Sequence, residues 1–182
     1  MVNSVRNYAK NQNPNKNHLF LDRSISNGVK FLEKKSQILS QSPSQTKKIG
    51  EVLAKEFLKT ATNRILVLGL IGDLGGGKTT FLQGFAKGLG IKEKILSPTF
   101  IILRKFKVKS LKSGFFYHID CYRITNPKEI LNLGFNKIIS DPNNIIAIEW
   151  ADRIKEILPP DTPILKFHFI DQNKRKIEIY AR

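Results

Sequence analysis

The 182-residue sequence is poor in cysteine, and its single thiol, Cys121, excludes an internal disulfide and any zinc site built from cysteines. Long apolar runs are also missing: none approaches the roughly 18–20 residues that a membrane-spanning helix needs, so we expect no membrane association. Acidic residues are few, with 15 Asp and Glu against 31 Lys and Arg. The remaining composition, 41% hydrophobic and 25% charged, indicates a globular protein of about one domain.

The formal net charge of +16 allows two interpretations. A basic face for nucleic acid is one of them, and it predicts tight, salt-sensitive binding of RNA by the isolated protein. The other is a compositional bias, since 23 Ile and 14 Asn accompany the lysines. We favour the bias, because net charge bears on solubility and association rather than on fold.

The N-terminal region differs from the rest of the chain. Residues 1–17 contain six Asn and no acid, and they are too polar to offset the entropy of ordering. We therefore expect residues 1–42 to be a mostly disordered basic extension, in which residues 28–39 could form a short helix, and residues 43–182 to be the folded domain. The extension lacks the arginine-rich amphipathic pattern of an organelle transit peptide.

The folded part shows the periodicities of an α/β protein. Apolar residues at helical spacing predict a helix over residues 46–60, and the apolar run that starts at Ile65 predicts a buried parallel strand. A glycine-rich turn and a helix from Lys78 to Gly90 follow, which is the start of an α/β unit. Further strands are predicted at 100–108, 115–119, 145–149, 163–169 and 176–181, and further helices at 127–132, 135–140 and 151–157.

The turn between this strand and helix has the sequence of a phosphate-binding loop. Residues 72–79 (GDLGGGKT) fit the pattern G-x-x-x-x-G-K-[ST], in which glycines let backbone N–H groups point at phosphate oxygens. The N-terminus of the following helix adds a positive dipole. Lys78 would reach the β- and γ-phosphates, and the Thr79 hydroxyl would ligate Mg²⁺. An Asn-Lys-x-Asp motif, usual in GTP-binding proteins, is missing, so ATP is the expected nucleotide.

Two acids are candidates to hold Mg²⁺ or orient water beside Thr79. Glu149 ends the apolar strand IIAIE, and Asp120 ends the strand FFYHID, where His118 shares its face. A helix cap or a surface ion pair is the alternative for either acid, and a structural role is the alternative for His118. Trp150 is either a core residue or a stacking surface for a base.

Three other segments are notable. Ser97-Pro98-Thr99-Phe100 lies where nucleotide-binding proteins of this kind often sense the γ-phosphate. Residues 104–112 (RKFKVKSLK) contain five basic residues and no acid, and the lysines at alternate positions predict a strand with one lysine-lined face. Such a face indicates either an edge strand protected by lysines or a contact to a partner or RNA. Cys121 has no metal-ligand spacing around it and is expected to be a small, partly buried residue.

The order of four motifs, GDLGGGKTTFLQGFAKGLG, SPTF, HIDCYR and IEW, closely resembles the TsaE (YjeE) family over residues 44–182. These are bacterial P-loop ATPases of tRNA threonylcarbamoyladenosine (t6A) synthesis. The resemblance implies a three-layer P-loop fold with a mixed, mainly parallel β-sheet flanked by helices. It also implies a cytoplasmic ATPase that drives turnover of the TsaD–TsaB complex and meets tRNA only through that complex.

The resemblance implies roles for the motif residues. Catalysis would involve Lys78, Asp120 and Glu149, and Mg²⁺ would be held by Thr79, Glu149 and Asp120. The expected ATP-binding residues are Asp73, Leu74, Gly75, Gly76, Gly77, Lys78, Thr79, Thr80, Thr99 and Trp150. Hydrolysis should be slow without partners, because the best internal candidate for an arginine finger is only Arg123.

A small-molecule kinase that uses the same phosphate-binding loop is the alternative function. Many such kinases have a lid rich in arginine, whereas the candidates here, Arg104, Arg123 and Arg153, are scattered.

Overall fold

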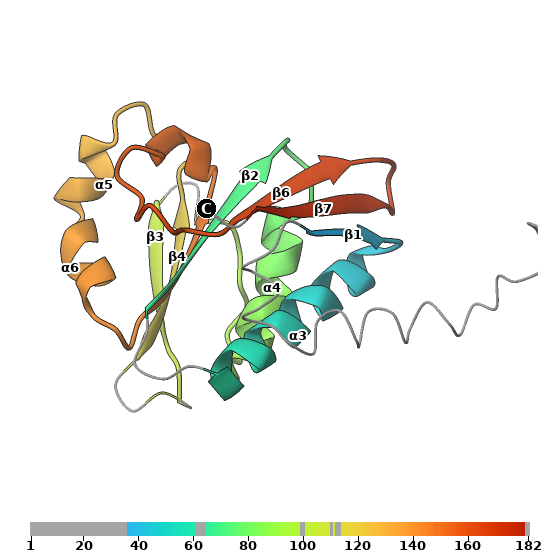
Figure 1. Ribbon diagram of the computed structural model, residues 1–182, viewed down its shortest axis with the longest axis horizontal. Coiled ribbons are helices and arrows are strands. Elements are labelled where there is room, and N and C mark those ends of the chain that lie inside the picture. Colours follow the sequence, from blue (N-terminus) through green and yellow to red (C-terminus); the bar gives the residue numbers. More distant parts are fainter. Residues whose placement is uncertain (1–35, 61–64, 99–100, 110, 112–113, 181–182) are drawn as a thin grey trace, which may run out of the picture.

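The computed structural model describes residues 36–60, 65–98, 101–109, 111 and 114–180. In these residues, seven strands form one sheet in the order β1-β7-β6-β2-β5-β4-β3 (Figure 1). The strands are β1 (Ser36–Ser40), β2 (Leu66–Gly72), β3 (Leu103–Lys107), β4 (Phe115–Asp120), β5 (Ile145–Glu149), β6 (Ile164–Phe169) and β7 (Arg175–Tyr180).

The centre of the sheet is parallel and its two sides are antiparallel. Strand β2 pairs in parallel with β5 and with β6, and β4 pairs in parallel with β5. The pairs β1–β7, β6–β7 and β3–β4 are antiparallel. Every residue of β5 is buried, as expected for a central parallel strand covered on both faces.

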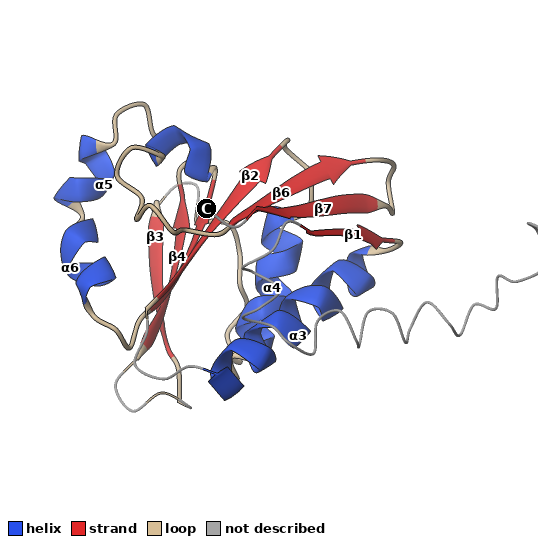
Figure 2. Cartoon of the chain, viewed as in Figure 1, coloured by secondary structure: helices blue, strands red, loops and turns tan. Residues whose placement is uncertain are grey.

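Helices cover both faces of the sheet (Figure 2). On one face, α3 (Pro43–Thr60) and α4 (Lys78–Gly88) pack on alternate strand residues such as Leu68 and Phe116. On the other face, α5 (Lys128–Asn132), α6 (Phe135–Ser140) and the 3-10 helix η1 (Ala151–Ile154) lie over a second core that includes Ile146 and Ile148. The predicted three-layer arrangement with a mixed sheet is confirmed.

Helices α3 and α4 pack closely because glycines lie at their contact. A Cβ atom added at Gly50 would overlap the backbone of Phe81, and one added at Gly84 would overlap the backbone of Lys47. The first turn of α3 is capped by Ser42, whose Oγ accepts a hydrogen bond from Gln45 N at 3.1 Å. The close packing of α3 against α4 fixes the position of α4, whose first residues contribute to the candidate site.

The structure corrects two expectations from the sequence. Residues 36–40, expected to belong to the disordered extension and to a short helix, form β1, which pairs with β7. Residues 41–42 connect β1 to α3, and residues 1–35 lie outside the described residues. The helix expected at 151–157 is a 3-10 helix over only four residues, Ala151–Ile154. In the described part of the chain, no helix is both long and apolar enough to cross a membrane.

Candidate functional site

The phosphate-binding loop joins the end of β2 to the start of α4. Gly75 and Gly77 adopt left-handed backbone conformations, with φ of 72° and 97°, that side chains disfavour. Gly77 is the N-cap of α4, whose first turn contains no acidic residue. The positive end of the helix dipole therefore faces the loop without a competing carboxylate from that turn.

Lys78 is only 4% exposed and points back into the loop. Its ammonium group donates hydrogen bonds to the carbonyl oxygens of Gly72 at 2.6 Å and Asp73 at 2.8 Å. It also lies 4.0 Å from the centroid of the Trp150 ring. Burial lowers the pKa of Lys78 from its ordinary value, and the negative charges of Glu149 and Asp120 oppose that shift.

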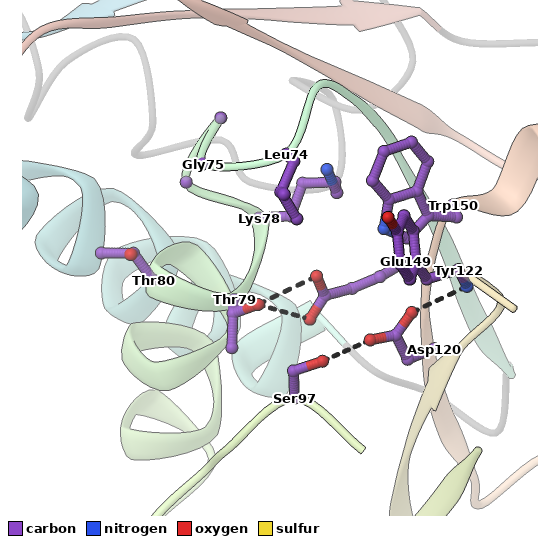
Figure 3. Close-up of a pocket in the computed structure, with 12 residues that line it drawn as sticks. Leu74, Gly75, Lys78, Thr79, Thr80, Ser97, Asp120, Tyr122, Glu149 and Trp150 are labelled. Carbon is purple, nitrogen blue, oxygen red and sulfur yellow. Dashed lines mark hydrogen bonds between the residues drawn. The ribbon is translucent and has the colours of Figure 1, made fainter. Parts of the chain in front are cut away.

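Thr79 and Glu149 come together from distant parts of the sequence. The Thr79 hydroxyl lies 2.9 Å from each of the two Glu149 carboxylate oxygens (Figure 3). His118 Nε2 lies 2.9 Å from Glu149 Oε1, and Nδ1 of the same fully buried ring has no hydrogen-bond partner among the described residues. This arrangement suits the tautomer with hydrogen on Nε2, which donates to Glu149.

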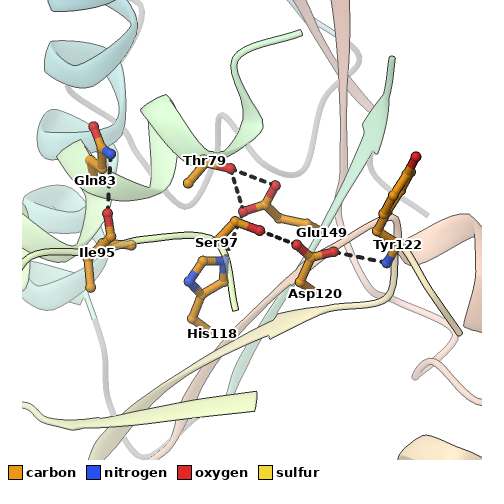
Figure 4. Close-up of polar contacts among 8 residues, drawn as sticks. All are labelled: Thr79, Gln83, Ile95, Ser97, His118, Asp120, Tyr122 and Glu149. Carbon is orange, nitrogen blue, oxygen red and sulfur yellow. Dashed lines mark hydrogen bonds and ion pairs between the residues drawn. The ribbon is translucent and has the colours of Figure 1, made fainter. Parts of the chain in front are cut away.

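Asp120 lies beside Glu149 because β4 and β5 are parallel neighbours that end together, with these two residues in register. Its Oδ2 accepts a hydrogen bond from the Ser97 hydroxyl, and its Oδ1 accepts one from Tyr122 N at 2.9 Å (Figure 4). The segment before Ser97 is tied to α4, since Gln83 Nε2 donates to Ile95 O at 3.2 Å. Asp120 is therefore held in place on both oxygens.

Aromatic side chains form the side of the site opposite the loop. Trp150 is half-buried and adopts a left-handed φ of 57°, which is strained for an aromatic residue. Its ring lies 5.1 Å from that of Tyr122, centroid to centroid. The Arg153 guanidinium lies 5.8 Å and 5.9 Å from the Tyr122 and Trp150 rings. Trp150 thus packs against the core and also faces the site.

These groups surround a pocket of about 330 Å³. It is lined by Leu74, Gly75, Gly76, Gly77, Lys78, Thr79, Thr80, Ser97, Asp120, Tyr122, Glu149 and Trp150. Most of the residues expected from the sequence are therefore brought together. Asp73 is exposed and does not line the pocket, although its carbonyl oxygen binds Lys78. Thr99 lies outside the described residues.

The oxygen atoms of Thr79, Glu149 and Asp120 are the kind of donors that Mg²⁺ prefers. Within the described residues, no group of three or more His, Cys, Asp or Glu side chains is arranged to hold a metal ion. Mg²⁺ at phosphate-binding loops usually takes one or two protein ligands and completes its shell with phosphate and water oxygens. The donor set fits Mg²⁺ bound together with a nucleotide.

Sequence reasoning missed two contributors to the site. Tyr122 lines the pocket, and its spacing of two from Asp120 within the HIDCYR motif is the signal that could have identified it. Arg175, on β7, donates from Nε to Gly75 O at 3.2 Å across 100 residues of sequence, and nothing local in the chain indicates that contact. The proposed arginine finger, Arg123, is exposed and is not among the residues that line the pocket.

Two lysines of the basic segment, Lys105 and Lys107, lie on β3 at the edge of the described sheet. In the described residues β3 is the last strand, and Lys105 and Lys107 are exposed while Arg104 and Phe106 are half-buried. Lys105 Nζ and Lys107 Nζ lie 3.7 Å and 4.6 Å from the centroid of the Phe115 ring. The expectation of an edge strand with exposed lysines is confirmed for β3, whereas a contact with a partner or RNA stays a prediction.

Comparisons with known proteins identify relatives of this chain. The family model "Threonylcarbamoyl adenosine biosynthesis protein TsaE" matches residues 40–177. Proteins named "tRNA threonylcarbamoyladenosine biosynthesis protein TsaE" are similar: the one from Rickettsia felis is 35% identical over 78% of either chain, and the one from Bacillus subtilis is 39% identical over 77% of this chain and 82% of its own.

Among solved structures, the crystal structure of YdiB from Bacillus subtilis is similar in fold. It superposes with a TM-score of 0.64 at 30% identity and covers 81% of this chain and 86% of its own. Taken with the family match over most of the folded chain, this shows that the protein belongs to the TsaE family of threonylcarbamoyladenosine biosynthesis.

Proposed function

We propose that the protein binds and hydrolyses ATP, with Mg²⁺, as the subunit that supports t6A formation by a TsaD–TsaB complex. The observation on which the proposal depends is the convergence of Lys78, Thr79 and Glu149 at the glycine-rich loop. Membership of a family named for t6A biosynthesis supplies the pathway.

The backbone conformation of the glycine-rich loop and the position of Lys78 support phosphate binding. The positive φ angles of Gly75 and Gly77 shape the turn that leads into α4. Unpaired N–H groups at the N-terminus of a helix, together with the helix dipole, bind phosphate oxygens. Lys78 would exchange its contacts with the Gly72 and Asp73 carbonyls for contacts with phosphate oxygens. A buried ammonium group interacts strongly with a phosphate because little water screens the charges.

Thr79 and Glu149 are the residues that would hold Mg²⁺, with Asp120 beside them. When bound, Mg²⁺ would neutralise charge on the phosphate oxygens and so assist transfer of the γ-phosphoryl group from ATP to water. In the structure, the hydrogen bond from Thr79 and the contact with His118 fix the position of the Glu149 carboxylate. The two side chains that would hold Mg²⁺ are therefore oriented before the metal ion binds.

Asp120 is the residue proposed to orient the attacking water. Its carboxylate lines the pocket next to Glu149, and both of its oxygens accept hydrogen bonds from neighbouring groups. Among the described residues, no arginine lines the pocket. An arginine finger contributes roughly 10³–10⁵ in rate, so we expect slow hydrolysis by the lone protein and faster hydrolysis when a partner completes the site.

ATP is proposed as the nucleotide because the chain lacks an Asn-Lys-x-Asp motif. Titration with labelled ATP and GTP checks this assignment; tighter binding of GTP would overturn it. The lack of arginine in the described pocket lining also gives no support to the alternative of a small-molecule kinase with an arginine-rich lid.

Reconstitution with TsaD, TsaB, tRNA, ATP and an activated donor of the threonylcarbamoyl group tests the proposal. The parent chain should support formation of modified tRNA, and Lys78→Ala should abolish it. Lys92→Ala is the matched control, because it removes an exposed lysine outside the pocket. Equal accumulation of modified tRNA with Lys78→Ala would show that the phosphate-binding loop is not needed.

Partner dependence is tested by measuring ATP turnover by the chain alone and with TsaD and TsaB added. We expect an increase of at least about tenfold, which is well below the full contribution of an arginine finger. Fast turnover by the chain alone would overturn the dependence on partners.

A further inference from the structure

The hairpin of β6 and β7 supports the phosphate-binding loop from outside the pocket. Phe167 of β6 is in register with Gly72, and a Cβ atom added at Gly72 would overlap its carbonyl oxygen. At Gly76, an added Cβ would lie 3.5 Å from the Phe167 Cβ. The loop is thus in contact with β6 at two of its glycines, and the hairpin lies alongside the connection from β2 to α4 (Figure 2).

Arg175, the first residue of β7, connects the turn of this hairpin to the loop. Its Nε donates a hydrogen bond to Gly75 O at 3.2 Å. Its Nη1 donates hydrogen bonds to the carbonyl oxygen of Asp171 and to that of Lys174, the latter at 2.8 Å. One guanidinium group therefore joins three backbone carbonyl oxygens from two segments that are far apart in sequence.

Packing restrains the same side chain. The guanidinium carbon lies 4.5 Å from the centroid of the Phe169 ring. The Arg175 stem lies against Gly77, where an added Cβ would be 3.5 Å from Cγ and 3.8 Å from Cδ. Arg175 thus touches the two glycines, Gly75 and Gly77, whose left-handed conformations shape the phosphate-binding loop.

We propose that Arg175 is a positioning residue that holds the phosphate-binding loop in the shape required for nucleotide binding. Glycines lose more conformational freedom on ordering than other residues, so a loop with three successive glycines needs external contacts to stay in one shape. A loop that is ordered before binding avoids that entropy cost when the nucleotide arrives. The inference depends on the nucleotide binding proposed above.

The contacts argue against two other roles for Arg175: direct binding of the phosphates, and a surface ion pair. The Arg175 side chain does not line the pocket, and its hydrogen bonds are made to carbonyl oxygens of the loop and turn, so it acts through the loop rather than on the phosphates. The acceptors are uncharged, so the interaction is not a surface ion pair. Lysine at this position would keep the charge but could not donate to three carbonyls in the same planar arrangement.

The test measures ADP affinity of the full chain in the presence of Mg²⁺, by the fluorescence of Trp150, the single tryptophan, which lines the pocket. Arg175→Ala should raise the dissociation constant about tenfold, as expected when hydrogen bonds that order a site are lost. Arg175→Lys should restore only part of the affinity. Lys174→Ala, which removes a neighbouring positive charge from the same turn, should stay within about twofold of the parent chain, because its charge is exposed and screened.

Hydrogen exchange of the nucleotide-free chain provides a second readout. Amides of residues 74–79 should exchange faster in Arg175→Ala, while amides of β2 and α3 keep their protection. Unchanged ADP affinity and unchanged loop exchange in Arg175→Ala would overturn the inference. Faster exchange throughout the sheet would also overturn it, since Arg175 would then be a general structural residue. A parent chain that does not bind ADP would overturn the proposed function, and the positioning role with it.

Discussion

The Thr79 hydroxyl lies 2.9 Å from both carboxylate oxygens of Glu149, a residue 70 positions away in the sequence. The contact joins the first turn of α4 to the end of β5. In the proposed ATPase, it holds both Mg²⁺ ligands together before metal or nucleotide arrives.

Glu149→Gln should weaken the response to Mg²⁺. The amide keeps the size of the side chain but loses the negative charge that a divalent cation prefers. We expect the Mg²⁺ concentration for half-maximal ATP hydrolysis to rise about 10- to 100-fold, the range found when groups around a metal are altered. Thr79→Ser is the control that retains the hydroxyl, and it should stay close to the parent chain; a Glu149→Gln chain with the parent's Mg²⁺ dependence would exclude Glu149 from the metal site.

Lys78→Met should abolish nucleotide binding without destabilising the free protein. Burial lowers the pKa of Lys78, which means that the folded state binds this proton less tightly than the unfolded state. The positive charge of Lys78 therefore costs stability at neutral pH relative to an uncharged side chain, and this cost decreases as pH rises from the lowered pKa toward the ordinary value. Melting temperatures from pH 7 to pH 10 should show Lys78→Met at or above the parent, with a difference that shrinks at high pH. Lys92→Met controls for removal of a positive charge; a Lys78→Met chain that melts well below the parent would contradict this account.

Asp120→Asn should separate hydrolysis from binding. Asp120 accepts hydrogen bonds from Ser97 and from Tyr122 N, and the amide can keep only part of this pattern. Loss of a group that orients water should lower hydrolysis about 10²- to 10⁴-fold, while ADP affinity changes little. Single-turnover hydrolysis and ADP titration on the same preparation give both values. A chain that loses affinity and hydrolysis to the same extent would instead assign Asp120 to nucleotide binding.

Cys121 should be unreactive in the folded protein. The side chain is fully buried, and burial, followed by the charge of Asp120, raises the pKa of its thiol to about 12. The thiolate is the reactive form, so a thiol reagent at pH 8 should label the folded chain far more slowly than the chain in denaturant. Since Cys121 is the single cysteine, the labelling rate reports opening of this part of the core. Rapid labelling without denaturant would show that β4 opens readily at its end.

The sequence predicted best those elements whose structure depends on local pattern. Strand β5 and helix α6 have the bounds expected, because an apolar run that ends at a charged residue and the turn sequence DPNN at 141–144, between the helix and the strand, are local signals. Strand β1 was missed because its five residues, SQILS, contain few apolar side chains; it exists because its backbone pairs with β7. The helix expected at 151–157 begins at the expected residue but is a 3-10 helix that ends at Ile154. Its hydrogen bonds join residues three apart, as from Arg153 N to Trp150 O and from Ile157 N to Ile154 O, and apolar spacing alone does not distinguish such short turns from an α-helix.

The candidate site also combines features that local sequence predicts with features that depend on tertiary structure. Lys78 and Thr79 are identified by a local motif, and Asp120 and Glu149 by their places at strand ends. The contact of Glu149 with His118 needs the pairing of β4 with β5, which no segment specifies alone. The contact of Arg175 with Gly75 needs the β6–β7 hairpin to lie against the loop, so it is determined by tertiary structure only.

The register of the central strands determines where the protein can tolerate insertions and deletions. Leu70, Glu149 and Asp120 occupy one row across β2, β5 and β4. Neighbouring residues of a strand point to opposite faces, so one residue inserted between Ile145 and Glu149 would turn the carboxylate toward α5 and α6 and away from Thr79. A residue inserted in the turn at 141–144, before β5, would leave the row intact. Changes in length should therefore be confined to the loops, even where the strands tolerate changes in residue type.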